Sequence, residues 1–304
     1  MNFDQLVARV TKGGIEYTIV RPGISLCLWY AEPAETLAPT IANILEEYIR
    51  FVPPQSLQTY YAQSGTWKRL NSRILNSTLE KLRFVSPGEN AEFHFGQEPV
   101  RNVGKFGAHF EGTPLDDEIL VHEDNPLYLE FPEDVLEWTN IERFYEFVHK
   151  VASMRQFDSG YCGYAFKHLF MSHLAESFEA ISHMAMRYIG FDISSDVARF
   201  SARGRVCNVS WLSLFGQQIV EALGGADLVR QALPSSMNIT EVGSGLLVRA
   251  AEKPIVGDVN RGAKDVAPLR RLAKLTKHLR VQEENLGPDD PTFAERWLSR
   301  FDME

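Results

Sequence analysis

The chain has 304 residues, 40 of them acidic and 31 basic, which gives a formal net charge of −9 at pH 7. Its 44% hydrophobic and 23% charged residues are ordinary for a globular protein and exclude a disordered or fibrous chain. No apolar run approaches the roughly 18 residues that span a membrane, and the acidic balance argues against nonspecific binding of nucleic acid. We therefore expect neither a membrane nor a nucleic acid as partner.

The cellular location is predicted from the N-terminus and the cysteines. Asp4 lies in the first ten residues, and no basic region followed by an apolar run marks a signal peptide. Cys27, Cys162 and Cys207 are odd in number, widely spaced and set among apolar residues, which favours free thiols over a disulfide framework. We expect a cytoplasmic protein.

The first 111 residues alternate strand and helix patterns. Residues 15–31 are rich in β-branched and aromatic side chains and are interrupted by Pro22 and Gly23, which predicts two strands joined by a turn. The other expected elements are a helix at about 37–49 that ends before Pro53, a helix around 74–82, and strands at 91–96 and 103–111.

A strongly acidic window follows, from residue 106 to residue 142. It holds eleven Asp and Glu residues and no Lys or Arg, so it accounts for the whole net negative charge of the chain. Within it, PLDDEILVHEDNP (114–126) predicts a hairpin with strands at 119–121 and 127–131 and carboxylates around its tip. Eleven like charges repel one another, and a basic ligand relieves that repulsion.

The remaining elements complete a mixed α/β fold. Thr139 with Glu142 three residues later predicts a capping box and a helix after it. We expect two packed lobes, each a mostly antiparallel or mixed sheet covered by helices, at 1–135 with the acidic hairpin and at 136–304. The expected elements of the second lobe are a strand at 160–171, helices at 174–188, 212–223 and up to 233, a strand at 244–251, a basic helix at 266–281 and a last helix at 292–301.

The candidate catalytic and metal-binding residues lie in surroundings that do not suit catalysis or metal binding. His173, Glu176, Glu179 and His183 share one arc of a helix, but the apolar stripe lies on the opposite side, so this arc faces solvent, where a metal finds no closed shell of ligands. The cysteines lack the exposed, electropositive surroundings of a nucleophile, and Gly243-Ser244-Gly245 lacks the spacing of a nucleophile elbow. We expect no catalytic residue, no metal and no cofactor.

Several separated motifs resemble a known family. NVSWLSLFG (208–216), the LGG at 223–225 and GSGLLVRAAEKPIVGDVNRG (243–262) occur in order and look like the C-terminal half of the type VI secretion immunity family, the TsiV/TsiT-like proteins. The similarity covers roughly residues 155–280. It implies a bacterial cytoplasmic protein without catalytic activity, which binds and blocks a cognate antibacterial toxin that in this family is often a nuclease.

This resemblance suggests what the acidic hairpin binds. A nuclease needs a basic cleft to hold phosphates, and a hairpin that carries carboxylates can enter it and take the phosphate positions. The predicted toxin-binding residues are Glu111, Asp116, Asp117, Glu118, Glu123 and Asp124.

Other readings stay open. In one alternative, the acidic hairpin is exposed to solvent and binds nothing. In another, its carboxylates form the active site of a metal-dependent hydrolase. The basic helix at 266–281 reads most simply as the outer face of an amphipathic helix. Together with the acidic hairpin of a neighbour it also allows a self-assembling scaffold, and a homodimer is possible.

Overall fold

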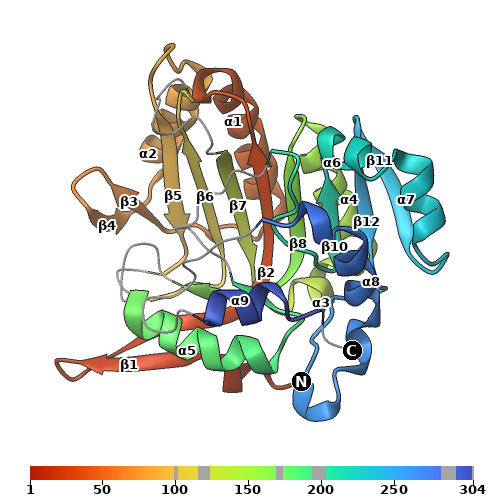
Figure 1. Ribbon diagram of the computed structural model, residues 1–304. Coiled ribbons are helices and arrows are strands. Elements are labelled where there is room, and N and C mark those ends of the chain that lie inside the picture. The colour runs from red at the N-terminus through yellow and green to blue at the C-terminus, as the bar shows by residue number, and fades with distance from the viewer. Residues whose placement is uncertain (99–101, 116–123, 169–173, 194–202, 282–291, 303–304) are drawn as a thin grey trace.

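The computed structural model describes residues 1–98, 102–115, 124–168, 174–193, 203–281 and 292–302. In these ranges one large sheet runs through the molecule, with helices on both of its faces (Figure 1). Its twelve strands are β1 (Ala8–Lys12), β2 (Ile15–Tyr30), β3 (Thr59–Ala62), β4 (Thr66–Arg69), β5 (Ala91–Gly96), β6 (Gly107–Gly112), β7 (Asn125–Phe131), β8 (Ser159–His168), β9 (Asp192–Ile193), β10 (Leu212–Phe215), β11 (Asn238–Val242) and β12 (Gly245–Arg249).

The sheet is antiparallel apart from one short parallel pairing. The strand order is β11-β12-β10-β8-β2-β7-β6-β5-β3-β4, with β1 paired to β2 and β9 paired in parallel to β8. The helices confirm the predicted mixed α/β class. They are α1 (Ala34–Phe51), α2 (Ser72–Arg83), α3 (Val135–Thr139), α4 (Ile141–Ser153), α5 (Leu174–Arg187), α6 (Gln217–Ala222), α7 (Ala226–Ala232), α8 (Ala267–Leu275) and α9 (Phe293–Leu298), with short 3-10 turns at Phe3–Leu6, Val259–Arg261, Lys264–Val266 and Lys277–Leu279.

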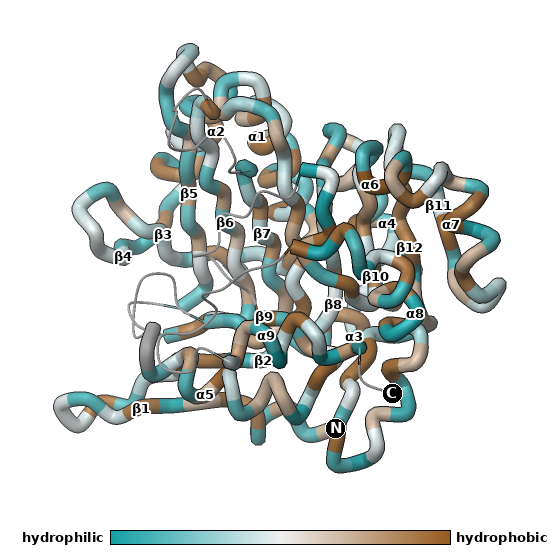
Figure 2. The backbone as a smooth tube through the Cα atoms, in the orientation of Figure 1, coloured by the Kyte–Doolittle hydropathy of each residue, from teal (hydrophilic) through white to brown (hydrophobic). Residues whose placement is uncertain are grey.

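Three hydrophobic clusters hold the helices to the sheet. The largest lies between one face and α1, α2 and α4; a second packs α5 and α9 against the long strands β2 and β8; a third lies under α6, α7 and α8. The hydropathy colours change within single turns of helices such as α7, as expected for helices that bury one side (Figure 2). Because the middle of the sheet is covered on both faces, residues Ile24–Tyr30 of β2 are all buried.

The prediction of two strands within residues 15–31 was wrong, since β2 runs unbroken through Pro22 and Gly23. On one side of β2, pairing with β1 ends at Val20 and pairing with β7 begins only at Ile24. Among the described strands, β8 is therefore the sole neighbour of Pro22, and the missing N–H of Pro22 interrupts no described ladder on the other side.

Three further predictions need correction. The expected helix at 212–223 begins as strand β10, and α6 starts only at Gln217; just after it, Gly224 has a positive φ of 88°. The residues Gly243 and Ser244 form the turn of a hairpin whose first strand, β11, was not predicted. The cap of α4 is Asn140, whose side chain accepts the backbone N–H of Arg143.

The predicted boundary after residue 135 falls at the start of α3. The sheet continues across it, because β2 pairs with β7 along one edge and with β8 along the other. The division into lobes stays a prediction.

Candidate functional site

The predicted toxin-binding residues lie in and around the connection from β6 to β7. Asp116, Asp117, Glu118 and Glu123, and the expected strand at 119–121, lie outside the described residues. Glu111 lies on β6 and Asp124 directly precedes β7. Because β7 pairs with β2 along one edge and with β6 along the other, the predicted pairing of 119–121 with 127–131 was wrong, and the acidic hairpin is the connection between β6 and β7.

Glu111 is mostly shielded from solvent at the base of the acidic hairpin. Its side chain is 15% exposed, and its Oε1 lies 3.5 Å from Nε2 of His94 on the adjacent strand β5. The Cα partner of Glu111 across that strand pair is Glu92, whose side chain is exposed. Glu111 therefore combines a contact inside the sheet with partial access to solvent.

Asp124 is buried, with 1% of its surface exposed, and its Oδ1 lies 3.5 Å from Nε of Arg203. The next residue, Asn125, closes the base: its Oδ1 accepts the backbone N–H of Thr113 at 2.8 Å, and its Nδ2 donates to the carbonyl of Glu32 at 2.7 Å. These bonds join Thr113, just after β6, to Asn125 at the start of β7.

The acidic window is divided by β7 between two ends of the sheet. Glu111 and Asp124 lie at the end where β6 finishes and β7 starts, whereas Glu133, Asp134 and Glu137 come after β7 has crossed the sheet. The seven residues of β7 extend over roughly 20 Å. The window is therefore two separate acidic regions, a division that the sequence analysis missed.

A buried charged cluster lies between them. Glu130 on β7 is 6% exposed, and its Oε2 lies 3.9 Å from Nε2 of His109. Burial alone raises the pKa of Glu130, but the charge of Lys167 and the His109 ring outweigh it and hold this pKa below its ordinary value. Burial lowers the pKa of Lys167 to about 8.

Lys167 joins two backbone segments through three carbonyl groups. Its Nζ donates to the carbonyl oxygens of Lys105 at 2.5 Å, Gly104 at 3.2 Å and Phe131 at 3.3 Å. Beside the cluster is a cavity of about 30 Å³ lined by residues that include His109, Glu130 and His168. A space of this size accommodates one or two water molecules, which excludes an organic substrate.

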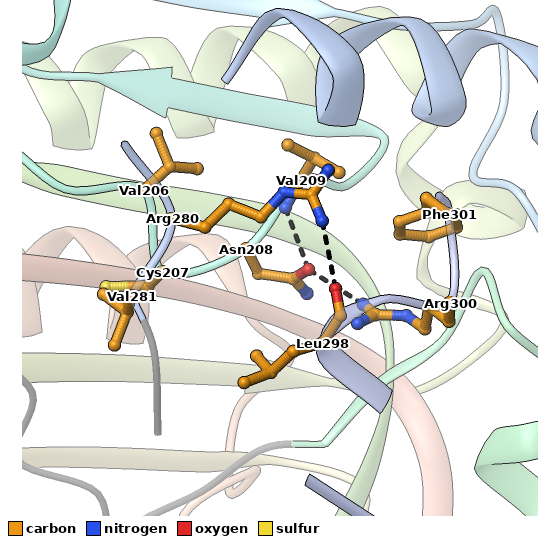
Figure 3. Close-up of a pocket in the computed structure, with 9 residues that line it drawn as sticks. All are labelled: Val206, Cys207, Asn208, Val209, Arg280, Val281, Leu298, Arg300 and Phe301. Atoms are coloured by element: carbon orange, nitrogen blue, oxygen red, sulfur yellow. Dashed lines mark hydrogen bonds between the residues drawn. The ribbon is translucent and has the colours of Figure 1, made fainter. Parts of the chain in front are cut away.

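A second cavity, of about 10 Å³, is lined by polar groups that attach the C-terminal residues to the sheet (Figure 3). Buried Arg300 donates to Oδ1 of Asn208 at 2.8 Å and to the carbonyl of Ile189 at 3.1 Å. Burial lowers the pKa of Arg300 to about 10 and raises that of Asp192, and their opposite charges act against both shifts. Arg280 donates to the carbonyl of Leu298 at 3.1 Å. These contacts stabilise the fold and leave no room for a ligand.

The described residues contain no group of three His, Cys, Asp or Glu side chains placed to hold a metal ion. On α5, Ile181 and Ala185 are buried while Glu179 and His183 are exposed, as the helix pattern predicted, and His173 lies outside the described ranges. Burial raises the pKa of Cys27 far above its ordinary value, so its thiol is protonated at neutral pH and is a poor nucleophile.

The basic helix forms as α8, although it is shorter than predicted. Leu269 and Leu272 are buried in the third cluster, while Arg271 and Lys274 are exposed on the outer side. This is the amphipathic arrangement that the sequence indicated. Among the helices of the described ranges, none has the length and apolar character needed to cross a membrane.

Comparisons with known proteins give a family match and a structural match. A family model, TsiV, described as type VI immunity for VRR-NUC, matches residues 40–301. A solved structure titled as the Pseudomonas aeruginosa T6SS protein PA0821 superposes with a TM-score of 0.83 at 20% identity, covering 97% of this chain and 88% of that chain. No curated protein matches. The second match shows a shared fold, and the first covers most of the chain.

Proposed function

This chain belongs to the TsiV family of type VI immunity proteins, and from that premise we propose that it neutralises a VRR-NUC nuclease toxin by tight binding, without catalysis of its own. The observation that carries the proposal is the family match over residues 40–301. The metal-dependent hydrolase and the self-assembling scaffold are not favoured. We place its action in the cytoplasm, where a nuclease reaches the chromosome.

The proposed contact is the acidic hairpin. Its carboxylates at Asp116, Asp117, Glu118 and Glu123 enter the basic cleft of the toxin and occupy phosphate positions, and opposite potentials speed the encounter. Two observations support this placement: the excess of acids over bases in the window, and the base of the hairpin, which Asn125 fixes to Thr113 and Glu32. A fixed base reduces the entropy lost when the hairpin binds.

The test is a co-purification with each VRR-NUC protein encoded in the same genome, each inactivated in its nuclease centre. Wild type is expected to retain one of them, and a variant with Asp116→Asn, Asp117→Asn, Glu118→Gln and Glu123→Gln is expected to release it as salt increases. A control with the same change in charge carries Glu80→Gln, Glu89→Gln, Glu252→Gln and Glu295→Gln, at exposed acids elsewhere.

The outcomes separate the function from the surface. Retention of a toxin by the hairpin variant as well as by wild type means that the hairpin is not the docking surface, and the binding function stands. Failure of wild type to retain any VRR-NUC protein contradicts the proposed function itself.

A further inference from the structure

The second acidic region adjoins an exposed tryptophan in the sequence. Trp138 on α3 is 40% exposed, although it is a large apolar side chain. Its ring lies 6.4 Å, centroid to centroid, from the rings of Phe51 and Phe106. Phe51 in turn packs on Phe131 and Phe147 within the largest hydrophobic cluster. Trp138 is thus supported by the core on one side and open to solvent on the other.

Three carboxylates lie next to this ring in the chain: Glu133, Asp134 and Glu137. Throughout the part of the chain that the structure describes, none of them has an ion pair or a side-chain hydrogen bond. Oε2 of Glu133 is shielded from solvent and still has no hydrogen-bond partner there. A buried oxygen without a donor costs free energy, so the fold itself leaves this carboxylate incompletely satisfied.

The charged groups around this corner leave the excess negative. Burial, together with the charges of Glu137 and Glu133, raises the pKa of Tyr164 to about 12, so both carboxylates act on the same spot. The charge of Glu133 also acts on Lys167, whose Nζ donates to three backbone carbonyls, and Arg143 lies over the ring of Phe51 at 5.6 Å.

We propose that Trp138, with the carboxylates of Glu133, Asp134 and Glu137, is a docking surface for a basic segment of the toxin, with an Arg or Lys side chain stacked on the indole. This inference rests on the proposed function and adds a contact at the opposite end of β7 from the hairpin. We call this surface the α3 corner.

The chemistry of the α3 corner selects a basic occupant for two reasons. An indole face attracts a guanidinium or ammonium group, and the unpaired carboxylates accept its N–H donors at the same time. Tryptophan is also enriched among the few interface residues that dominate affinity, because its truncation leaves a large pocket unfilled. A nuclease that holds a polyanion presents basic segments of the required kind.

The experiment measures the Kd and the association rate for the VRR-NUC protein that wild type retains, at low and at moderate salt. Trp138→Ala is expected to weaken binding by at least about 30-fold. Trp138→Phe keeps an aromatic face and is expected to lose less, and it serves as the main probe if Trp138→Ala does not fold. Phe84→Ala is the matched control, because Phe84 is 83% exposed and lies outside the acidic window.

The carboxylates are tested separately. The triple variant Glu133→Gln, Asp134→Asn and Glu137→Gln is expected to bind about tenfold more weakly at low salt, mainly through a slower association rate. A control with Glu80→Gln, Glu89→Gln and Glu252→Gln changes the net charge equally and is expected to stay within about threefold of wild type.

Each outcome decides between explanations. If wild type binds the toxin and both the Trp138 variants and the triple variant bind equally well, the α3 corner is not a docking surface, while the proposed function stands. If the triple variant and its control weaken binding equally, the effect is one of net charge and the α3 corner is rejected. If wild type binds no VRR-NUC protein, the proposed function fails and this inference fails with it.

Discussion

Carboxylates from one acidic stretch of sequence have two different environments. On β6 and β7 and at the start of α4, they face cations or histidines: Glu111 faces His94, Asp124 faces Arg203, Glu130 faces Lys167 and His109, and Glu142 faces Arg249. At the α3 corner, Glu133, Asp134 and Glu137 have no ion pair and no side-chain hydrogen bond in the described structure, although the charge of Glu133 also acts on Lys167. The first group is part of the fold, and the second is available to a partner.

This difference shows how an acidic stretch is to be interpreted. A buried carboxylate persists only where a partner compensates its lost hydration, so its presence reflects folding. An exposed and unpaired carboxylate gains little stability for the chain and repels its neighbours. The comparison predicts that changes to the paired group lower stability, while changes to the unpaired group alter binding alone.

The largest effect is expected for Lys167→Met. This change leaves Glu130 charged and buried and removes the donor from three backbone carbonyls, so the free energy of unfolding falls by about 3–5 kcal/mol. Chemical denaturation measures it. Adding Glu130→Gln to Lys167→Met removes the unpaired charge and is expected to restore part of the loss. A loss of less than about 1 kcal/mol in the free energy of unfolding would show that Lys167 does not stabilise the fold as proposed.

The pH dependence of stability tests Glu130 itself. Because its folded pKa lies below its ordinary value of 4.5, ionised Glu130 contributes stability above pH 4.5, and this contribution disappears as the pH falls through the folded pKa. The free energy of unfolding of wild type is therefore expected to approach that of Glu130→Gln as acid is added below pH 4.5. A difference between the two proteins that stays constant with pH contradicts the assignment.

A smaller loss is expected at the exposed pair of Glu142 and Arg249. Nη1 of Arg249 lies 2.9 Å from Oε1 of Glu142, but the Glu142 side chain is 70% exposed, so water and salt screen the attraction. Glu142→Gln should lower the free energy of unfolding by about 0–1 kcal/mol, and salt should remove the difference. A loss above about 2 kcal/mol would show that an exposed ion pair contributes as much stability as a buried one, which contradicts the comparison.

The smallest effect on stability is expected for the triple variant at the α3 corner. Neutralising Glu133, Asp134 and Glu137 removes repulsion and breaks no bond in the described structure, so the free energy of unfolding should stay within about 0.5 kcal/mol of wild type. Thermal unfolding at low salt measures this directly. A clear destabilisation would reveal that these carboxylates belong to the fold.

The sequence predicted what depends on neighbouring residues and missed what depends on distant ones. The apolar stripe of α5 repeats every three or four residues, so both its buried and its exposed side chains were predicted correctly. The unbroken course of β2 depends on which strands pair beside Pro22, and this is set by residues more than a hundred positions away. The local turn signal of Pro22 and Gly23 contains no information about which distant strands pair with β2.

The same limit applies to the candidate site. The sequence located the acidic excess, but the partners that divide it come from other parts of the chain: Arg249, for example, is 107 residues from Glu142. The exposure of Trp138 also depends on how α3 packs against Phe51 and Phe106. Function was predicted through the motifs at 208–262, which the family match includes, whereas the contact residues remain proposals.

The central claim, that this chain disarms a VRR-NUC nuclease by binding it, is tested most directly by titrating the purified chain into a DNA-cleavage reaction of the active toxin. The account predicts that cleavage falls in proportion to added chain and stops near one chain per toxin, with an unrelated acidic protein as control. Cleavage that continues undiminished at several-fold excess of folded chain, for every VRR-NUC protein of the same genome, would contradict it.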